Sequence, residues 1–402
     1  MNFTTYKPEI RIAAIGNVDS AKSTTISVIK NKIKDDGRGF ARNKILKYKH
    51  EFNTGRTSSI TQSFINNKDK IIDFVDLAGH EKYLKTTITG LNGFNINYAM
   101  ITIGSDRGII GMTKEHIALA ASLKIPIFFV ITKMDIAKEH KLINIKKKIV
   151  NILNHKIIKK KPIYVNNSNL ELIINNFNKK YDFIPIFEIS NVSGLNTDML
   201  RKFIYNLKNN IKIEPDSNEI LFKIDDKFKV TGIGTVVSGF LNKGIINKND
   251  NLFIGPFQGK FKQVIVKSIH DNFKNEIDSL VSGQSGCFNI KSINKKNFLN
   301  YSLIKKGLII TNKPISISKF EADVTILHHP TTIKENYQPV IHCGTVRQTA
   351  KICKMSKQLV RTGDTAKVLF EFLFHPEYIE LNSKIVFREG NTKGIGRIIK
   401  IH

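Results

Sequence analysis

The stretch Gly16-Asn-Val-Asp-Ser-Ala-Lys-Ser-Thr24 follows an apolar run, Ile12 to Ile15, near the start of the chain. In a turn of this composition glycine lets backbone N–H groups approach phosphate oxygens, a lysine reaches the outer phosphates, and the next hydroxyl ligates Mg²⁺. Ala21 occupies the place of the second glycine of such loops. The stretch predicts a phosphate-binding loop, with an ordinary strand–turn–helix junction as the alternative. The expected ligand contacts are Gly16, Asn17, Val18, Asp19, Ser20, Ala21, Lys22, Ser23 and Thr24.

A second polar element, Asp76-Leu-Ala-Gly79-His80, follows the mainly apolar residues 71–75. An aspartate at the end of a buried strand can hold Mg²⁺ through water, and the Gly79 N–H can contact a γ-phosphate. Taken singly, Asp76 could equally be a helix cap. Its position after the loop favours a role at the same nucleotide.

A third element, Thr132-Lys133-Met134-Asp135, follows the run Ile127 to Ile131, and a fourth, Ser190-Asn191, follows another apolar run. A carboxylate at Asp135 can accept hydrogen bonds from the guanine N1–H and amino group, while the lysine stem lies across the purine. Such sites discriminate against bases that lack these donors by a factor of roughly 10⁴ to 10⁵. Each element alone could be a solvated turn or a cap. Four in series, each after a strand-like run, predict a guanine-nucleotide site.

Lysine and arginine outnumber aspartate and glutamate by 63 to 34, which gives a net charge of +29. This excess predicts a polyanionic partner such as RNA. Residues 141–161 carry eight lysines and no acidic residue. Their apolar positions recur at helical spacing, so the lysines form either a solvated helix face or an RNA-facing patch. A second basic stretch, residues 38–49, has the position of a nucleotide-dependent switch.

The length of 402 residues predicts more than one domain. Strand-like and helical patterns alternate from Arg11 to about Leu207, which predicts an α/β domain with a mainly parallel sheet and helices on both faces. Short alternating runs follow and predict two β-barrels. The expected domains are residues 1–214, 215–315 and 316–402. No apolar run is long enough to cross a bilayer and no signal-peptide core is visible, so we expect a cytoplasmic monomer without membrane contact.

The order of one nucleotide domain and two barrels resembles the translational GTPases of the elongation factor Tu type. The likeness lies in VDLAGHEKY at 75–83, VTGIGTVVSGFLNKGIINKND at 230–250, KFEADVTIL at 319–327 and FREGNTKGIGRI at 387–398. A more specific resemblance, to the eukaryotic GTP-binding protein 1 and 2 family, lies in GRGFARNKILKYKHEFNTGRTSS at 37–59. It covers nearly the whole chain and implies a P-loop GTPase fold.

The resemblance implies roles for individual residues. Lys22 would hold the β- and γ-phosphates, Ser23 and Thr57 would ligate Mg²⁺, and Asp76 would act on the metal through water. Ser58 is the alternative to Thr57. Gly79 would sense the γ-phosphate, and His80 would orient the attacking water, with Val18 as one side of an apolar gate. Thr132 stands where asparagine is usual and would keep a hydroxyl hydrogen bond.

Together these features predict an Mg²⁺-dependent GTPase of the elongation-factor type, which hydrolyses GTP to GDP slowly until tRNA and the ribosome stimulate it. The alternative is a GTP-dependent RNA-binding switch with weak hydrolysis, acting in mRNA turnover or ribosome quality control. Asp135 disfavours an ATPase. Arg38, Arg42 and Arg56 lie in the right region for an internal arginine finger, but the sequence assigns none of them.

Overall fold

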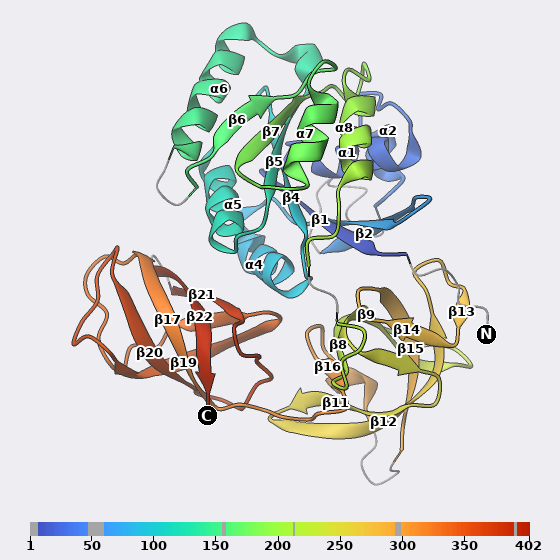
Figure 1. Ribbon diagram of the computed structural model, residues 1–402, viewed down its shortest axis with the longest axis vertical. Coiled ribbons are helices and arrows are strands. Elements are labelled where there is room, and N and C mark those ends of the chain that lie inside the picture. Colours follow the sequence, from blue (N-terminus) through green and yellow to red (C-terminus); the bar gives the residue numbers. More distant parts are fainter. Residues whose placement is uncertain (1–6, 47–59, 155–157, 212–213, 294–298, 390–391) are drawn as a thin grey trace. The chain divides into compact units, whose positions relative to one another are not determined.

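The computed structural model describes residues 7–46, 60–154, 158–211, 214–293, 299–389 and 392–402. These residues form two compact units, which are coloured along the sequence in Figure 1. The N-terminal unit consists of residues 7–91 and 95–211, and the C-terminal unit holds the remaining described residues.

The N-terminal unit is built on a seven-stranded sheet with the strand order β2-β3-β1-β4-β5-β7-β6. β2 pairs antiparallel with β3, and the other neighbouring pairs are parallel. The interior strand β1 is buried along its whole length, as expected for a parallel strand covered on both faces. The strands are β1 (Glu9–Gly16), β2 (Thr61–Asn66), β3 (Ile71–Asp76), β4 (Tyr98–Gly104), β5 (Ile127–Thr132), β6 (Lys161–Tyr164) and β7 (Phe183–Glu188).

Helices cover both faces of this sheet. Ile12 of β1 shares one apolar cluster with Ile26 of α1, Phe177 of α7 and Phe203 of α8. Because side chains alternate along a strand, Ala13 points to the other face, where α5 contacts β1 and β4; Figure 1 shows these layers. The helices are α1 (Lys22–Asn31), α2 (Phe40–Asn43), α4 (Leu84–Gly93), α5 (Gly111–Ser122), α6 (Glu139–Leu153), α7 (Leu170–Phe177) and α8 (Thr197–Asn206).

The C-terminal unit begins with a β-barrel around a core that includes Phe222, Val237, Val264 and Phe288. Its ring runs β11-β16-β8-β9-β15-β12 and closes through pairing of β11 with β12, while β13 extends the sheet beside β12. The strands are β8 (Leu221–Val230), β9 (Gly234–Lys243), β10 (Ile245–Asn247), β11 (Asn251–Phe257), β12 (Lys260–His270), β13 (Glu276–Ile277), β14 (Ser279–Val281), β15 (Ser285–Ser292) and β16 (Ile309–Thr311).

A second closed barrel follows, with the strand order β17-β20-β19-β18-β21-β22. Alternate residues of β17, among them Phe320, Ala322 and Val324, point into its core. Its strands are β17 (Lys319–His328), β18 (Val340–Cys343), β19 (Val346–Met355), β20 (Thr365–Phe372), β21 (Lys384–Glu389) and β22 (Thr392–Ile401).

The predicted fold class, an α/β domain with helices on both faces followed by two β-barrels, is confirmed. The predicted boundaries near residues 214 and 315 remain predictions. Both barrels fall in one compact unit. The basic stretch predicted as helical from Lys141 contains a helix, α6, that ends at Leu153. None of the helices among the described residues is long and apolar enough to cross a membrane.

Candidate nucleotide site

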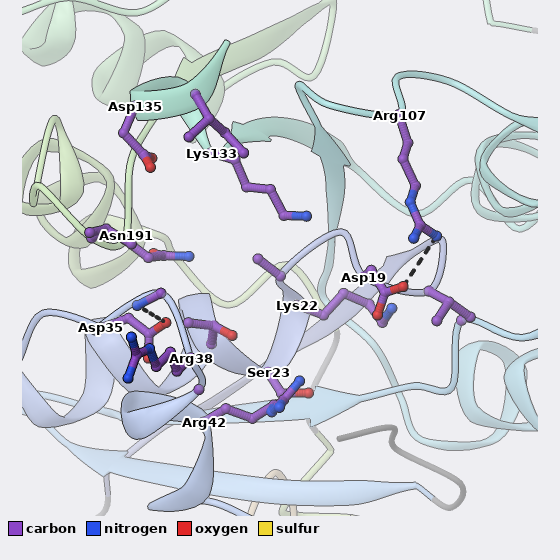
Figure 2. A pocket seen from close by; sticks show the side chains of 18 of the residues that line it. Asp19, Lys22, Ser23, Asp35, Arg38, Arg42, Arg107, Lys133, Asp135 and Asn191 are labelled. Atoms are coloured by element: carbon purple, nitrogen blue, oxygen red, sulfur yellow. Dashed lines mark hydrogen bonds and ion pairs between the residues drawn. The ribbon is translucent and has the colours of Figure 1, made fainter. Parts of the chain in front are cut away.

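A cleft of about 1030 Å³ opens in the N-terminal unit, where the carboxyl ends of its parallel strands meet. Figure 2 shows Lys22 and Ser23 in one part of this cleft and Lys133, Asp135 and Asn191 in another. Strand ends of this kind are the usual ligand sites of open α/β sheets because the loops that follow them converge there.

The loop after β1 has the backbone of a tight turn. A Cβ added at Gly16 would lie 2.4 Å from the Thr102 carbonyl oxygen, so only glycine fits this position. The hydroxyls of Ser20 and Thr102 lie 2.7 Å apart and tie the loop to β4. Ala21 caps α1 with φ 63° and ψ 29°, in the left-handed region that glycine adopts without strain. The residue that departs from the glycine pattern therefore has the conformation for which glycine is usual.

Lys22 begins α1 and lies buried, with 7% of its surface exposed. Its Nζ donates to the carbonyl oxygens of Asn17 at 2.8 Å and Gly16 at 3.3 Å. Burial lowers the pKa of Lys22, and the carboxylates of Asp76 and Asp19 oppose that shift. The ammonium group is thus held over the loop, where it would meet the phosphates of a ligand.

Ser23 and Asp76 bring oxygen donors together beside this lysine. The Ser23 hydroxyl, in the first turn of α1, donates to Asp76 Oδ2 at the end of β3. A hydroxyl and a carboxylate are the hard oxygen ligands that suit Mg²⁺, which keeps several waters of its own. The two residues therefore fit a magnesium ion, which they would hold beside Lys22. Gly79 lies close by, since an added Cβ would come within 2.5 Å of Lys22 Nζ.

His80 lies at the start of the short 3-10 helix Glu81–Tyr83, and its side chain is exposed along the cleft. Its Nδ1 accepts a hydrogen bond from the Lys82 backbone N–H at 3.1 Å. This bond leaves Nε2 as the nitrogen that carries the proton in the neutral ring. Val18 lines the same cleft, and its role as one side of a gate stays a prediction.

The other end of the cleft is assembled from the loops after β5 and β7. Ser190 Oγ donates to Asp135 Oδ1 at 2.5 Å, which fixes the carboxylate predicted to read guanine. Asn191 Nδ2 donates to the Thr25 hydroxyl of α1 at 3.0 Å. Thr132 is fully buried, and its hydroxyl donates to the Ser20 carbonyl at 3.1 Å. Thr132 therefore braces the phosphate loop from beneath and does not line the cleft.

Two further segments contribute to the site. The sequence did not point to the first, and it offered the second only as a basic, switch-like stretch with arginine-finger candidates. The loop after β4 contributes Ser105, Asp106 and Arg107, whose contacts reach both ends of the cleft. The segment that begins at Asp35 contributes Arg38 and Arg42. Two glycines that flank an Asp-Arg pair after a strand, as in Gly104-Ser-Asp-Arg-Gly108, were the available signal for the first segment.

The charged side chains of the cleft favour a ligand that carries several negative charges at one end and a base at the other. Its cationic side chains are Lys22, Arg38, Arg42, Lys82, Arg107 and Lys133, and its carboxylates are Asp19, Asp35 and Asp135. Six cations against three carboxylates leave a net positive site. Asp135 lies at the opposite end from the phosphate loop, so the negative charge is placed where a purine could supply N–H donors.

The sequence matches two known domain families, one in the N-terminal unit and one in the second barrel. The elongation factor Tu GTP binding domain matches residues 7–211, and the elongation factor Tu C-terminal domain matches residues 313–402. The chain belongs to the elongation factor Tu family. The predicted resemblance to translational GTPases of this type is confirmed.

This family member is similar to GTP-binding protein 1 of Xenopus laevis, with 40% identity over 98% of the chain and 63% of the relative. It is 33% identical to GTP-binding protein 2 of Homo sapiens, over 98% of the chain and 69% of the relative. The chain thus spans about 63% of the length of GTP-binding protein 1. The GTP-bound structure of the S. cerevisiae Ski7 GTPase-like domain has the same fold, with a TM-score of 0.77, 15% identity and coverage of 98% of this chain and 97% of that one.

The predicted site residues of this elongation factor Tu family member fall into two layers. The cleft is lined by Val18, Asp19, Ala21, Lys22, Ser23, Thr24, Gly79, His80, Lys133, Asp135 and Asn191. Gly16, Asn17, Asp76 and Ser190 do not line the cleft but bond to residues that do. Ser20 and Thr132 also lie outside the lining, where Thr132 bonds to Ser20 and Ser20 to Thr102. Thr57, its alternative Ser58, and Arg56 lie outside the described residues.

Proposed function

We propose that this protein binds GTP with Mg²⁺ in the cleft and hydrolyses it to GDP and phosphate. One observation carries the proposal: a buried lysine and a paired hydroxyl and carboxylate lie at one end of the cleft, and an oriented carboxylate lies at the other. This arrangement is complementary to a guanosine triphosphate along its length. Family membership supports the same activity.

Within this reaction each end of the cleft has a separate task. Lys22 neutralises phosphate charge, and the metal held by Ser23 and Asp76 would stabilise the charge that develops between the β- and γ-phosphates. His80 would orient the attacking water, a role that needs a polar ring at hydrogen-bond reach more than a strong base. Asp135 would select guanine over adenine.

We propose that the hydrolysis partner is a ribosome with bound tRNA, which would place the protein in the cytoplasm. The net charge of +29 supports a polyanionic partner of this size. A GTPase without an arginine finger turns over at about 10⁻⁴ per second until it is activated. We expect a similar rate for the protein alone, and a large increase with ribosomes.

The left-handed backbone at Ala21 favours one second candidate, a GTP-dependent RNA-binding switch with weak hydrolysis. A strained phosphate loop could bind nucleotide and still position it poorly for reaction. This candidate keeps the nucleotide site and the RNA partner but loses the stimulated turnover.

GTP hydrolysis with and without ribosomes, measured for the wild-type chain and His80→Ala, tests the proposal. We expect His80→Ala to lose about 10² to 10⁴ of the stimulated rate, while GTP affinity stays nearly unchanged because the ring is exposed beside the cleft. His140→Ala is the matched control, since His140 is exposed at the start of α6.

Three results would count against the proposal. Stimulated hydrolysis that is equal in wild type and His80→Ala removes the role of His80. Tight GTP binding without any stimulated hydrolysis supports the switch. Competition by ATP as strong as that by GDP contradicts the guanine assignment.

A further inference from the structure

The loop between β4 and α5 contacts Lys133 at two points. The Ser105 hydroxyl donates to the Lys133 carbonyl oxygen at 2.7 Å. Asp106 Oδ2 lies 2.8 Å from Lys133 Nζ, and about 30% of each side chain is exposed. Both the backbone and the ammonium group of this lysine are therefore held by neighbouring residues of a single loop.

Lys133 needs such support because of its conformation. Its φ of 61° lies in the left-handed region, which costs a non-glycine residue roughly 1 to 2 kcal/mol. A free lysine side chain also samples many rotamers, and holding it in one of them costs up to about 2 kcal/mol. A residue that pre-arranges Lys133 would remove part of this cost from ligand binding.

Asp106 is itself positioned by its surroundings. A Cβ added at Gly104 would lie 2.5 Å from Asp106 Oδ1, so the carboxylate occupies space that only glycine leaves open. Lys141 Nζ of α6 donates to the Asp106 carbonyl oxygen at 2.8 Å. Partial burial acts to raise the pKa of Asp106, but Lys133 and two backbone N–H groups outweigh it and lower that pKa. The aspartate is thus a fixed anion that faces Lys133.

We propose that Ser105 and Asp106 are positioning residues that hold the stem of Lys133 flat against the guanine base. The inference rests on the proposed binding of GTP and deepens it, because it assigns base affinity to residues outside the Thr132–Asp135 element. Asp106 acts through Lys133 and makes no contact with the nucleotide. Asp135 reads the base edge, while Asp106 keeps the platform for the base face in place.

The test is a double-mutant cycle on nucleotide affinity with Asp106→Asn and Lys133→Met. Asp106→Asn keeps the side-chain shape but removes the charge, and Lys133→Met keeps most of the stem but removes the ammonium group. We expect Asp106→Asn to weaken GDP binding by about 5- to 10-fold in the wild-type background, since a charge-assisted hydrogen bond is lost at a partly exposed site. In the Lys133→Met background we expect no further loss.

Two additional variants separate positioning from a general effect on the fold. Gly104→Ala should reproduce the loss, because its methyl group displaces the Asp106 carboxylate. Asp198→Asn is the matched control, since Asp198 is exposed on α8 and forms an ion pair with Arg201 there. The loss should be the same for GTP, GDP and inosine triphosphate, which share the purine face but differ in phosphates or in the amino group. The chain contains no tryptophan, so calorimetry is the direct measurement.

The outcomes are distinguishable. An equal loss from Asp106→Asn in both backgrounds shows that Asp106 does not act through Lys133 and overturns the inference. An unchanged affinity in Asp106→Asn alone overturns it as well. If the wild-type chain binds neither GTP nor GDP, the proposed function fails and the inference fails with it. If only the inference fails, the wild-type chain still binds both nucleotides, so the two failures are distinguishable.

Discussion

At the phosphate end of the cleft, Lys22 and Ser23 belong to one short stretch of sequence, and Ser23 bonds to Asp76 at the end of β3. At the base end, Asp135 depends on Ser190, and Lys133 depends on Asp106, each from a different strand end. The phosphate end is built mainly from one short stretch whose residue types are recognisable in the local sequence, while Thr102 and Asp76 hold it in place. The base end uses side-chain contacts between loops that are far apart in the chain. A single substitution in one of these loops is therefore expected to change the selectivity for the base.

The largest expected effect falls at the base end. Asp135→Asn replaces an acceptor-only carboxylate by an amide that is partly a donor, so the guanine edge loses its partner. We expect the preference for GTP over xanthosine triphosphate to fall by roughly 10⁴. Competition binding with the two nucleotides measures this ratio. An unchanged ratio would show that the base lies elsewhere and that the two ends do not form one site.

A smaller effect is expected behind the phosphate end, at His116 of α5. The ring is fully buried, and burial together with the Lys22 charge lowers the pKa of His116 to about 4. Between pH 6.5 and about 4 the unfolded chain then binds a proton that the folded chain does not, so stability falls as pH decreases. From pH 7 to pH 5 this histidine should lower the free energy of unfolding by about 2 kcal/mol.

Urea unfolding of the full chain at both pH values tests this expectation with His116→Leu. The leucine variant should gain about 2 kcal/mol relative to wild type on going from pH 7 to pH 5. His140→Leu, at an exposed position of α6, should show no such gain. Equal pH dependence in all three proteins would mean that the ring is hydrated in the folded state.

The smallest effect concerns Ala21, where the phosphate end departs from its own local pattern. With φ at 63°, replacing alanine by glycine relieves roughly 1 to 2 kcal/mol of backbone strain but adds flexibility to the unfolded chain. We expect Ala21→Gly to tighten GTP and GDP binding by up to about 5-fold. Lys32→Gly is the control, because Lys32 has φ 54° at the other end of α1.

Calorimetric titration with GTP and GDP measures the affinities of wild type, Ala21→Gly and Lys32→Gly. Equal affinities for Ala21→Gly and wild type would show that the left-handed backbone of alanine at position 21 does not weaken nucleotide binding. Tighter binding in the Lys32→Gly control would indicate that helix stability, and not the loop, limits affinity.

Much of the fold was predictable because its patterns are local. The alternation of strand-like and helical patterns from Arg11 to about Leu207 indicated a mainly parallel sheet, and the alternation in strands such as β17 indicated a barrel wall. Closure of the first barrel through β11 and β12 was not visible, since strand pairing depends on contacts distant in sequence. The division between the barrels near residue 315 stays a prediction.

The site shows the same division. Four motifs identified the residues of the cleft because each follows a strand whose carboxyl end must lie at the same sheet edge. Asp106 and Arg107 escaped notice, since a short loop with mixed charge is more often solvated than functional. Thr132 was expected to keep a hydroxyl hydrogen bond, and the structure places that bond on the Ser20 carbonyl beneath the phosphate loop.

By itself the sequence determined the kind of ligand, the order of the domains and the residues at the phosphate end, because these depend on residue type and strand-like runs that recur locally. Only the tertiary structure decided the left-handed backbone at Ala21, the pairing of Asp106 with Lys133 and the brace from Thr132 to the loop. Backbone torsions and contacts between distant loops arise from packing of the whole sheet, so no stretch of sequence contains them.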